Sequence, residues 1–284
     1  MPIPALEPAA PVLTAHLFAG LHAELMTLLR GLSPTDWRRP TRAGAWQVRD
    51  VAAHLLDGAL RKLSFHRDAA PPPPPAAPIT DHASLLAHLN ALNAEWTRAA
   101  LRFSPRVLLD LLDLTGAQLS RFVAGLDPMA PALFGVSWAG EQASLNWLDT
   151  GREYTERWHH QQQIREAVGA PLLEERHWLH PVLDVSAWAL PFAYKDVEAR
   201  VGQAVALVVT GEAGGSWSLL REAGAWRLYA GAAPDPACRI VTDGATAWRV
   251  YFKAIDPGEA AARVRVEGET RLGRTFLGTL AVMA

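Results

Sequence analysis

The spacing of apolar residues changes once along this chain of 284 residues. From Leu13 to Leu32, leucines recur every three or four positions, which places them on one face of a helix. Similar spacing predicts helices at about residues 46–67, 81–102, 105–125 and 144–168. After about residue 175, short apolar runs separated by glycine or proline predict strands. We expect strands at 204–210, 216–220, 226–230, 238–242 and 263–267, and helices at 180–193, 245–255 and 272–282. The predicted fold is an α-helical bundle followed by a smaller α+β domain.

Proline and glycine mark the breaks in this pattern. Five consecutive prolines at 71–75 exclude a helix, because proline lacks the backbone donor, and predict a stiff loop. Gly169 and Pro171 end the helix at 144–168, as a C-terminal glycine followed by proline commonly does. We therefore expect two domains, residues 1–172 and 173–284.

Composition excludes several classes of function. Lys and Arg number 27 against 29 Asp and Glu, so the net charge of −2 gives no basis for binding nucleic acid or an anionic membrane. No run approaches the roughly 20 apolar residues of a membrane span. Cys238 is the only cysteine, which excludes an intramolecular disulfide and favours a cytoplasmic location. We expect small-molecule partners, and the sequence leaves the oligomeric state open.

Two residues of the helix at 144–168 have the spacing of metal ligands. Glu156 and His160 are four residues apart, so they lie one turn apart on one face. Asp149 and Gln163 share this polar strip, and the alternative interpretation is an ordinary solvent-exposed helix. His159 gives a competing Glu156–His159 pair typical of di-metal bundles, but those sites need a second such pair and two further glutamates, and we find no suitable set.

A second histidine lies in the helix at 46–67. His54 is at the edge of the apolar stripe, and Asp50, one turn earlier, could orient its imidazole. The alternative is a boundary histidine with one hydrogen bond. Together His54, Glu156 and His160 would form a two-histidine, one-carboxylate metal site with open positions. Spacing alone does not show that they converge.

Two distant motifs resemble the mycothiol-dependent maleylpyruvate isomerase family, which belongs to the DinB-like metal-binding bundles. The first is LSPTDW at 32–37 with GAWQVRDVAAHL at 44–55, and the second is ERWHHQQQIREAVG at 156–169. The tail is similar to a sterol-carrier-protein-like domain in DGATAW at 243–248, AIDPGEA at 254–260 and VRVEGE at 264–269. The resemblance to the isomerase family covers residues 13–170, and the resemblance of the tail to the sterol-carrier-protein-like domain is looser.

This resemblance implies a divalent metal, most plausibly Zn²⁺, held by His54, Glu156 and His160, and a mycothiol-type thiol as cosubstrate. The implied activity is isomerisation of, or S-transfer to, a small electrophile. Many relatives have an aspartate where Gln163 stands, so a contact to a ligand or the substrate differs here. The resemblance also implies that an arginine of the tail assists the site, and Arg263, Arg265 and Arg271 are the candidates. We expect three residues to support the metal ligands or contact the substrate: Asp50, Gln163 and Arg271.

Two other functions stay open at this point. A metal-activated water would hydrolyse a small amide or ester, with turnover that needs no thiol. Alternatively, the tail holds an apolar ligand beside Trp217, Trp226 and Trp248, and the protein is not an enzyme. The sequence does not identify the thiol, the electrophile or the native metal.

Overall fold

The computed structural model describes residues 6–282, with every side chain in that range except that of His82. Its contacts group into two compact units. One contains Ala15–Asp127 and Glu156–Leu172 and is helical; the other contains residues up to Thr14, Pro128–Thr155 and residues from Leu173 onward. This confirms the fold class, a helical region plus a sheet domain. The two-domain division at residue 172 stays a prediction, since segments 6–14 and 128–155 group with the sheet.

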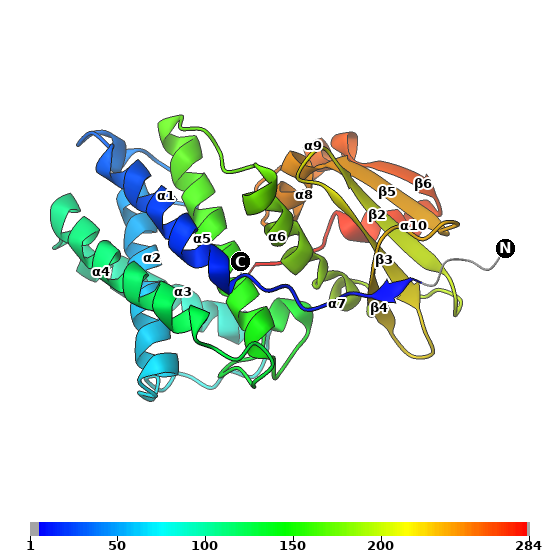
Figure 1. Ribbon diagram of the computed structural model, residues 1–284, viewed down its shortest axis with the longest axis horizontal. Helices are drawn as coiled ribbons and strands as arrows, with labels where there is room; N and C mark the ends of the chain where they lie inside the picture. The colour runs from blue at the N-terminus through cyan, green and yellow to red at the C-terminus, as the bar shows by residue number, and fades with distance from the viewer. Residues whose placement is uncertain (1–5, 283–284) are drawn as a thin grey trace. The chain divides into compact units, whose positions relative to one another are not determined.

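The helical unit is built from long helices (Figure 1). Their bounds are α1 (Phe18–Arg30), α2 (Val48–Lys62), α3 (His82–Ala100), α4 (Pro105–Ala124) and the second half of α5 (Asn146–Val168), with short turns η1 (Ala15–Leu17), η2 (Asp36–Arg38) and the π-helical turn η3 (Leu63–Arg67). Buried aliphatic side chains, including Leu25, Leu56 and Leu112, join α1, α2 and α4 in one core. The proline-rich segment between α2 and α3 is exposed and non-helical, as expected.

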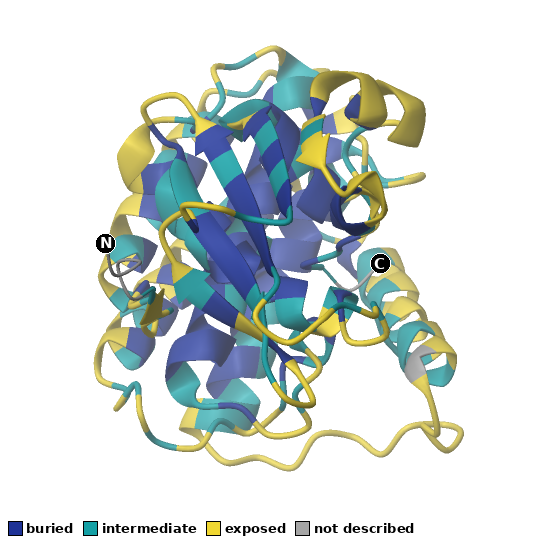
Figure 2. Ribbon diagram, turned by 90° about the vertical axis from the view of Figure 1, so that its right-hand side faces the viewer, coloured by how far each residue is buried: buried dark blue, intermediate teal, exposed yellow. Residues whose placement is uncertain are grey.

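The other unit contains a mixed six-stranded sheet in the order β1-β4-β3-β2-β5-β6. Its elements are β1 (Glu7–Pro8), η4 (Ser137–Ala139), α6 (Arg176–Ala187), α7 (Leu190–Ala193), β2 (Ala204–Thr210), β3 (Gly215–Arg221), β4 (Trp226–Ala230), β5 (Cys238–Asp243), α8 (Gly244–Tyr251), α9 (Pro257–Arg263), β6 (Arg265–Gly268) and α10 (Thr270–Phe276). β2 pairs parallel with β5, and the other pairs are antiparallel. The central strand β2 is almost wholly apolar and buried (Figure 2).

Several tail elements differ from expectation. The helix predicted to end at 255 ends at Tyr251, because Lys253 takes a left-handed φ of 53°. α9 was not predicted, although Asp256 caps it by accepting the N–H groups of Gly258 and Glu259. The helix expected at 180–193 is the pair α6 and α7, and the one expected at 272–282 begins at Thr270 and ends at Phe276. Among residues 6–282, no helix is both long and apolar enough to cross a membrane.

Candidate metal centre

Helix α5 is polar yet buried. Every residue from Trp158 to Arg165 is buried, including the run HHQQQ at 159–163. The alternative interpretation of this segment as a solvent-exposed helix is therefore wrong. A buried helix is ordinarily apolar on all sides, so each polar side chain here needs a partner inside the protein.

Hydrogen bonds to α1 fix the rotation of α5 about its axis. Gln161 donates its Nε2 to the carbonyl of Leu21 at 3.1 Å. Arg165 donates to the Glu24 carboxylate at 2.9 Å and to the Pro171 carbonyl at 2.8 Å. The helix ends at Gly169, whose φ of +71° suits a residue without a side chain. These contacts determine which residues of α5 face α2.

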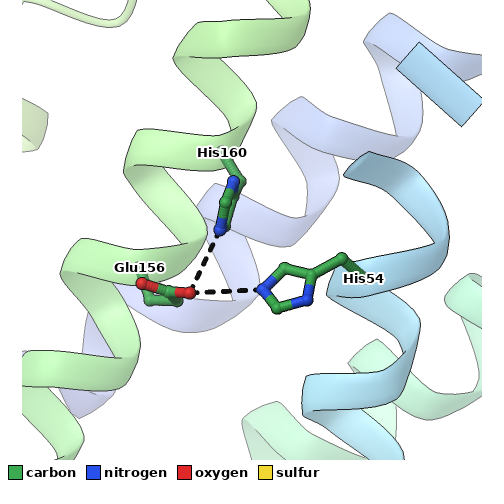
Figure 3. A group of neighbouring side chains, drawn as sticks. All are labelled: His54, Glu156 and His160. Atoms are coloured by element: carbon green, nitrogen blue, oxygen red, sulfur yellow. Dashed lines mark hydrogen bonds and ion pairs between the residues drawn. The ribbon is translucent and has the colours of Figure 1, made fainter. Parts of the chain in front are cut away.

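His54 of α2 and Glu156 and His160 of α5 converge on one point, as the sequence predicted they could (Figure 3). Their ligand atoms all lie within 4.8 Å of one another. Nε2 of His54 is 3.3 Å and Nε2 of His160 is 3.1 Å from the same oxygen, Oε1 of Glu156. Within residues 6–282 these side chains form the single candidate group of metal ligands. The His54 side chain makes one hydrogen bond among the described residues, as the alternative interpretation expects, but its partner is Glu156 of the cluster.

The electrostatics of the cluster follow from two imidazoles that share one carboxylate. Burial disfavours the charged carboxylate, but the neighbouring His160 and His54 hold the pKa of Glu156 well below its usual range. Burial also works against protonated His160, yet the carboxylate raises its pKa. At His54 burial prevails and the pKa is lowered. Glu156 is therefore the negatively charged member of the cluster, and His54 is its neutral imidazole.

Gln163 determines which nitrogen of His160 faces the cluster. The Nδ1–H of His160 donates to Oε1 of Gln163 at 2.7 Å, so its Nε2 is left for Glu156 or a metal. The Gln163 amide then donates to Nε2 of His159 at 3.3 Å. Burial lowers the pKa of His159 to about 3, so this imidazole is neutral and can accept. His159 lies beside the candidate ligand group and is not part of it.

The other expected supporting residues have different surroundings. Asp50 accepts the backbone N–H of Gln47 at 3.0 Å, which stabilises the start of α2. Among the described residues it forms no hydrogen bond with His54. Arg271 lies on α10 and donates Nη2 to the carbonyl of Glu198 at 2.6 Å.

Sequence reasoning missed one neighbour of the cluster, Trp46. Its ring centre is 5.1 Å from that of His54 and 6.4 Å from that of His160, so it packs against both imidazoles. From the sequence we placed residue 46 only at the start of the helix predicted at 46–67. The one sequence feature that pointed to this contact was the position of Trp46 in the GAWQ segment, eight residues before His54.

The fold and these side chains define a helical-bundle protein with a two-histidine, one-carboxylate candidate metal site and an appended mixed-sheet unit. Residues 18–165, just over half of the chain, match the family described as mycothiol maleylpyruvate isomerase N-terminal domain. The chain belongs to this family.

Solved structures agree with this assignment at the level of fold. The crystal structure of mycothiol-dependent maleylpyruvate isomerase aligns with a TM-score of 0.52 and 14% identity, over 90% of this chain and 92% of that one. A histidine-to-alanine mutant of the same enzyme aligns with a TM-score of 0.53 and 13% identity, over the same shares. No curated protein sequence matches the chain.

Proposed function

We propose that this protein is a metal-dependent enzyme that uses a low-molecular-weight thiol of the mycothiol type either to isomerise a small electrophilic substrate or, as an S-transferase, to join that thiol to the substrate. The single observation that carries the proposal is the convergence of His54, Glu156 and His160 on one point. Family membership supports the thiol, because the family description and the names of both structural neighbours include mycothiol.

The three side chains fit a divalent metal. Two imidazole nitrogens and one carboxylate oxygen are ligands that Zn²⁺ accepts in catalytic sites, where a further position stays open. Both Nε2 atoms already face the carboxylate oxygen that would share the ion with them. When bound, the metal would lower the pKa of a coordinating thiol and so supply a thiolate near neutral pH.

The chain's own residues hold this site in shape. Glu156 would supply the negative charge that balances a bound cation, and Gln163 keeps Nε2 of His160 directed at the cluster. The Trp46 ring packs beside both imidazoles. Cys238 is buried, and its pKa is raised to about 11. We therefore assign the role of nucleophile to the thiol cosubstrate and not to Cys238.

Several expectations stay predictions beside this proposal. These are zinc as the native metal, a role for Asp50 in orienting His54, contact of Arg271 with the substrate, the sterol-carrier-like character of the tail and a cytoplasmic location. The sheet unit is mixed α+β, as such a tail requires.

Cobalt substitution and thiol addition test the proposed function. We expect cobalt-loaded protein to change its visible absorption when mycothiol is added, because a sulfur ligand alters the spectrum of Co²⁺. Zinc-loaded protein should then convert maleylpyruvate only with thiol present. His160→Ala should lose both responses. Turnover of an amide or ester without thiol would instead support the hydrolase, and an unchanged cobalt spectrum would contradict the thiol role.

A further inference from the structure

Three arginines line one cavity of the sheet-containing unit. Arg200 precedes β2, Arg221 ends β3 and Arg271 lies on α10, so the cluster joins residues 71 positions apart in the sequence. The cavity is open to solvent, measures about 470 Å³ and is completed by Glu198, Ala199 and Gln203. This volume lies within the range of small-molecule sites.

These arginines lack the acidic partners that others in the same unit have. Arg227 pairs with Glu222 at 2.7 Å, and Arg249 pairs with Glu174 at 3.5 Å. Among the described residues, no carboxylate oxygen lies within 4.0 Å of a guanidinium nitrogen of Arg200, Arg221 or Arg271. Three positive charges therefore lie around one cavity without direct neutralisation, an arrangement that attracts anions.

The nearest acidic residues have other contacts. Glu198 meets Arg271 through its backbone carbonyl, which accepts the guanidinium at 2.6 Å. Glu269 accepts a hydrogen bond from the Gln203 amide at 2.8 Å. Gln203 also accepts the backbone N–H of Arg200 at 2.7 Å, so the loop before β2 is held in place. Arg271 and the loop before β2 are thus held by hydrogen bonds and not by ion pairs with the arginines.

Arg221 carries the second, independent observation. Its Nη1 is shielded from solvent and has no hydrogen-bond partner among the described residues. The guanidinium carbon lies 6.0 Å from the ring centre of Trp226, a contact that offsets only part of the cost of shielding a charge. Arg221 therefore lines the cavity with one guanidinium nitrogen whose hydrogen-bonding capacity is unused among the described residues.

We infer that this cavity binds a small anion that carries a phosphate or a pair of carboxylates, through Arg200, Arg221 and Arg271. Guanidinium groups form paired hydrogen bonds with both types of oxyanion. The site shares no residue with His54, Glu156 and His160, so the inference does not depend on the metal centre; Arg271 is the one residue that it has in common with the expected substrate contacts. It assigns Arg271 to an anion site of the sheet-containing unit.

Calorimetric titration of the full-length protein tests this site, with inorganic phosphate as one probe and malonate as the other, in low-salt buffer. We expect saturable binding of at least one probe with one site per chain, weakened as salt is raised. The probe that binds more tightly identifies phosphate or dicarboxylate chemistry.

Single variants make the assignment specific. Arg271→Gln and Arg200→Gln, both at exposed positions, should each weaken binding about tenfold or more, the loss of one charge-assisted contact. Arg274→Gln is the matched control, because Arg274 is exposed on the same helix and does not line the cavity. Arg221→Gln should weaken binding as well, and its melting curve checks that this variant is folded. Absence of saturable binding for both probes, or equal weakening in Arg274→Gln, would overturn the inference.

Discussion

At the scale of single residues, Gln163 has the most consequence for the candidate metal centre. It accepts from Nδ1 of His160 and donates to Nε2 of His159, so it fixes the tautomers of two neighbouring imidazoles. Because the Gln163 amide is neutral, it accepts this hydrogen bond more weakly than a carboxylate would, and the His160 imidazole is correspondingly less electron-rich. Gln163 therefore tunes the imidazole that His160 offers as a candidate ligand.

Removing this amide should weaken metal binding without unfolding the protein. We expect Gln163→Leu to lower zinc affinity about 10- to 100-fold, the usual cost of losing such a supporting hydrogen bond. Competition with a zinc-binding dye measures the change. Gln163→Glu, which can still accept from His160, should stay much closer to wild type. Equal affinity in the leucine variant and wild type would show that Gln163 does not orient the ligand.

At the scale of elements, the contact between α1 and α4 depends on a glycine. A Cβ at Gly116 would lie 2.1 Å from Cε1 of His22, and the cavity beside it, about 10 Å³, has room for no more than one water. Gly116→Ala should therefore destabilise the protein by ~1–3 kcal/mol, despite the ~1 kcal/mol that alanine gains within a helix.

Urea unfolding with a helix-matched control checks this packing. Gly125, at the end of the same helix, would place a Cβ no closer than 3.6 Å to its neighbours and has a negative φ, so Gly125→Ala should be nearly neutral. A Gly116→Ala protein as stable as Gly125→Ala would show that His22 moves aside freely.

His22 should also make stability depend on pH. Burial, followed by the charge of Arg157, lowers the pKa of this histidine below its unfolded value of 6.5. Below about pH 6.5 the unfolded chain binds the proton more readily, so stability is complete above that pH and falls as the pH drops toward the folded pKa. The loss from one such group is at most ~1.4 kcal/mol per pH unit.

Comparing wild type with His22→Gln isolates the pH-dependent stability that His22 contributes, because the other buried histidines are present in both the wild type and the variant. Between pH 7 and pH 5, urea unfolding of the variant should show a smaller loss of stability than wild type. Identical pH slopes would contradict the assignment of a lowered pKa to His22.

The sequence predicted most elements because their periodicity is local. The strands at 204–210 and 226–230 coincide with β2 and β4, and the helix at 105–125 coincides with α4 within one residue. The two-residue strand β1 was missed, since its pairing with β4 depends on a segment more than 200 residues away. α9 was missed because its seven residues are too few for a clear apolar repeat.

The candidate site was predictable only in part. Spacing brought Glu156 and His160 together, but only the packing of α2 against α5 brings His54 to them. From hydropathy, the polar run of α5 was expected to lie at the protein surface. It is buried, because its side chains form hydrogen bonds with α1 and with one another. No local pattern reports such partners, and the contact of Trp46 with both imidazoles was unpredictable for the same reason.

At the scale of the whole molecule, a metal bound by the native state alone must raise stability. The ligands come from two helices and, in the sequence, lie about 100 residues apart, so the unfolded chain does not preform the site. Zinc at 100 times its dissociation constant should stabilise the protein by ~2.7 kcal/mol. Thermal unfolding with and without zinc should show a higher melting temperature for wild type and no shift for His160→Ala. A similar shift in both proteins would place zinc elsewhere.

The metal content of the purified protein tests the central claim most directly. Wild type and His54→Ala, prepared without a histidine tag and checked for folding by circular dichroism, would be measured in parallel by inductively coupled plasma mass spectrometry. We predict about one zinc per wild-type chain and its loss in the variant. A folded His54→Ala protein that keeps the full metal content, or a wild type that holds no metal even after reconstitution, would contradict the assignment of His54, Glu156 and His160 as a metal centre.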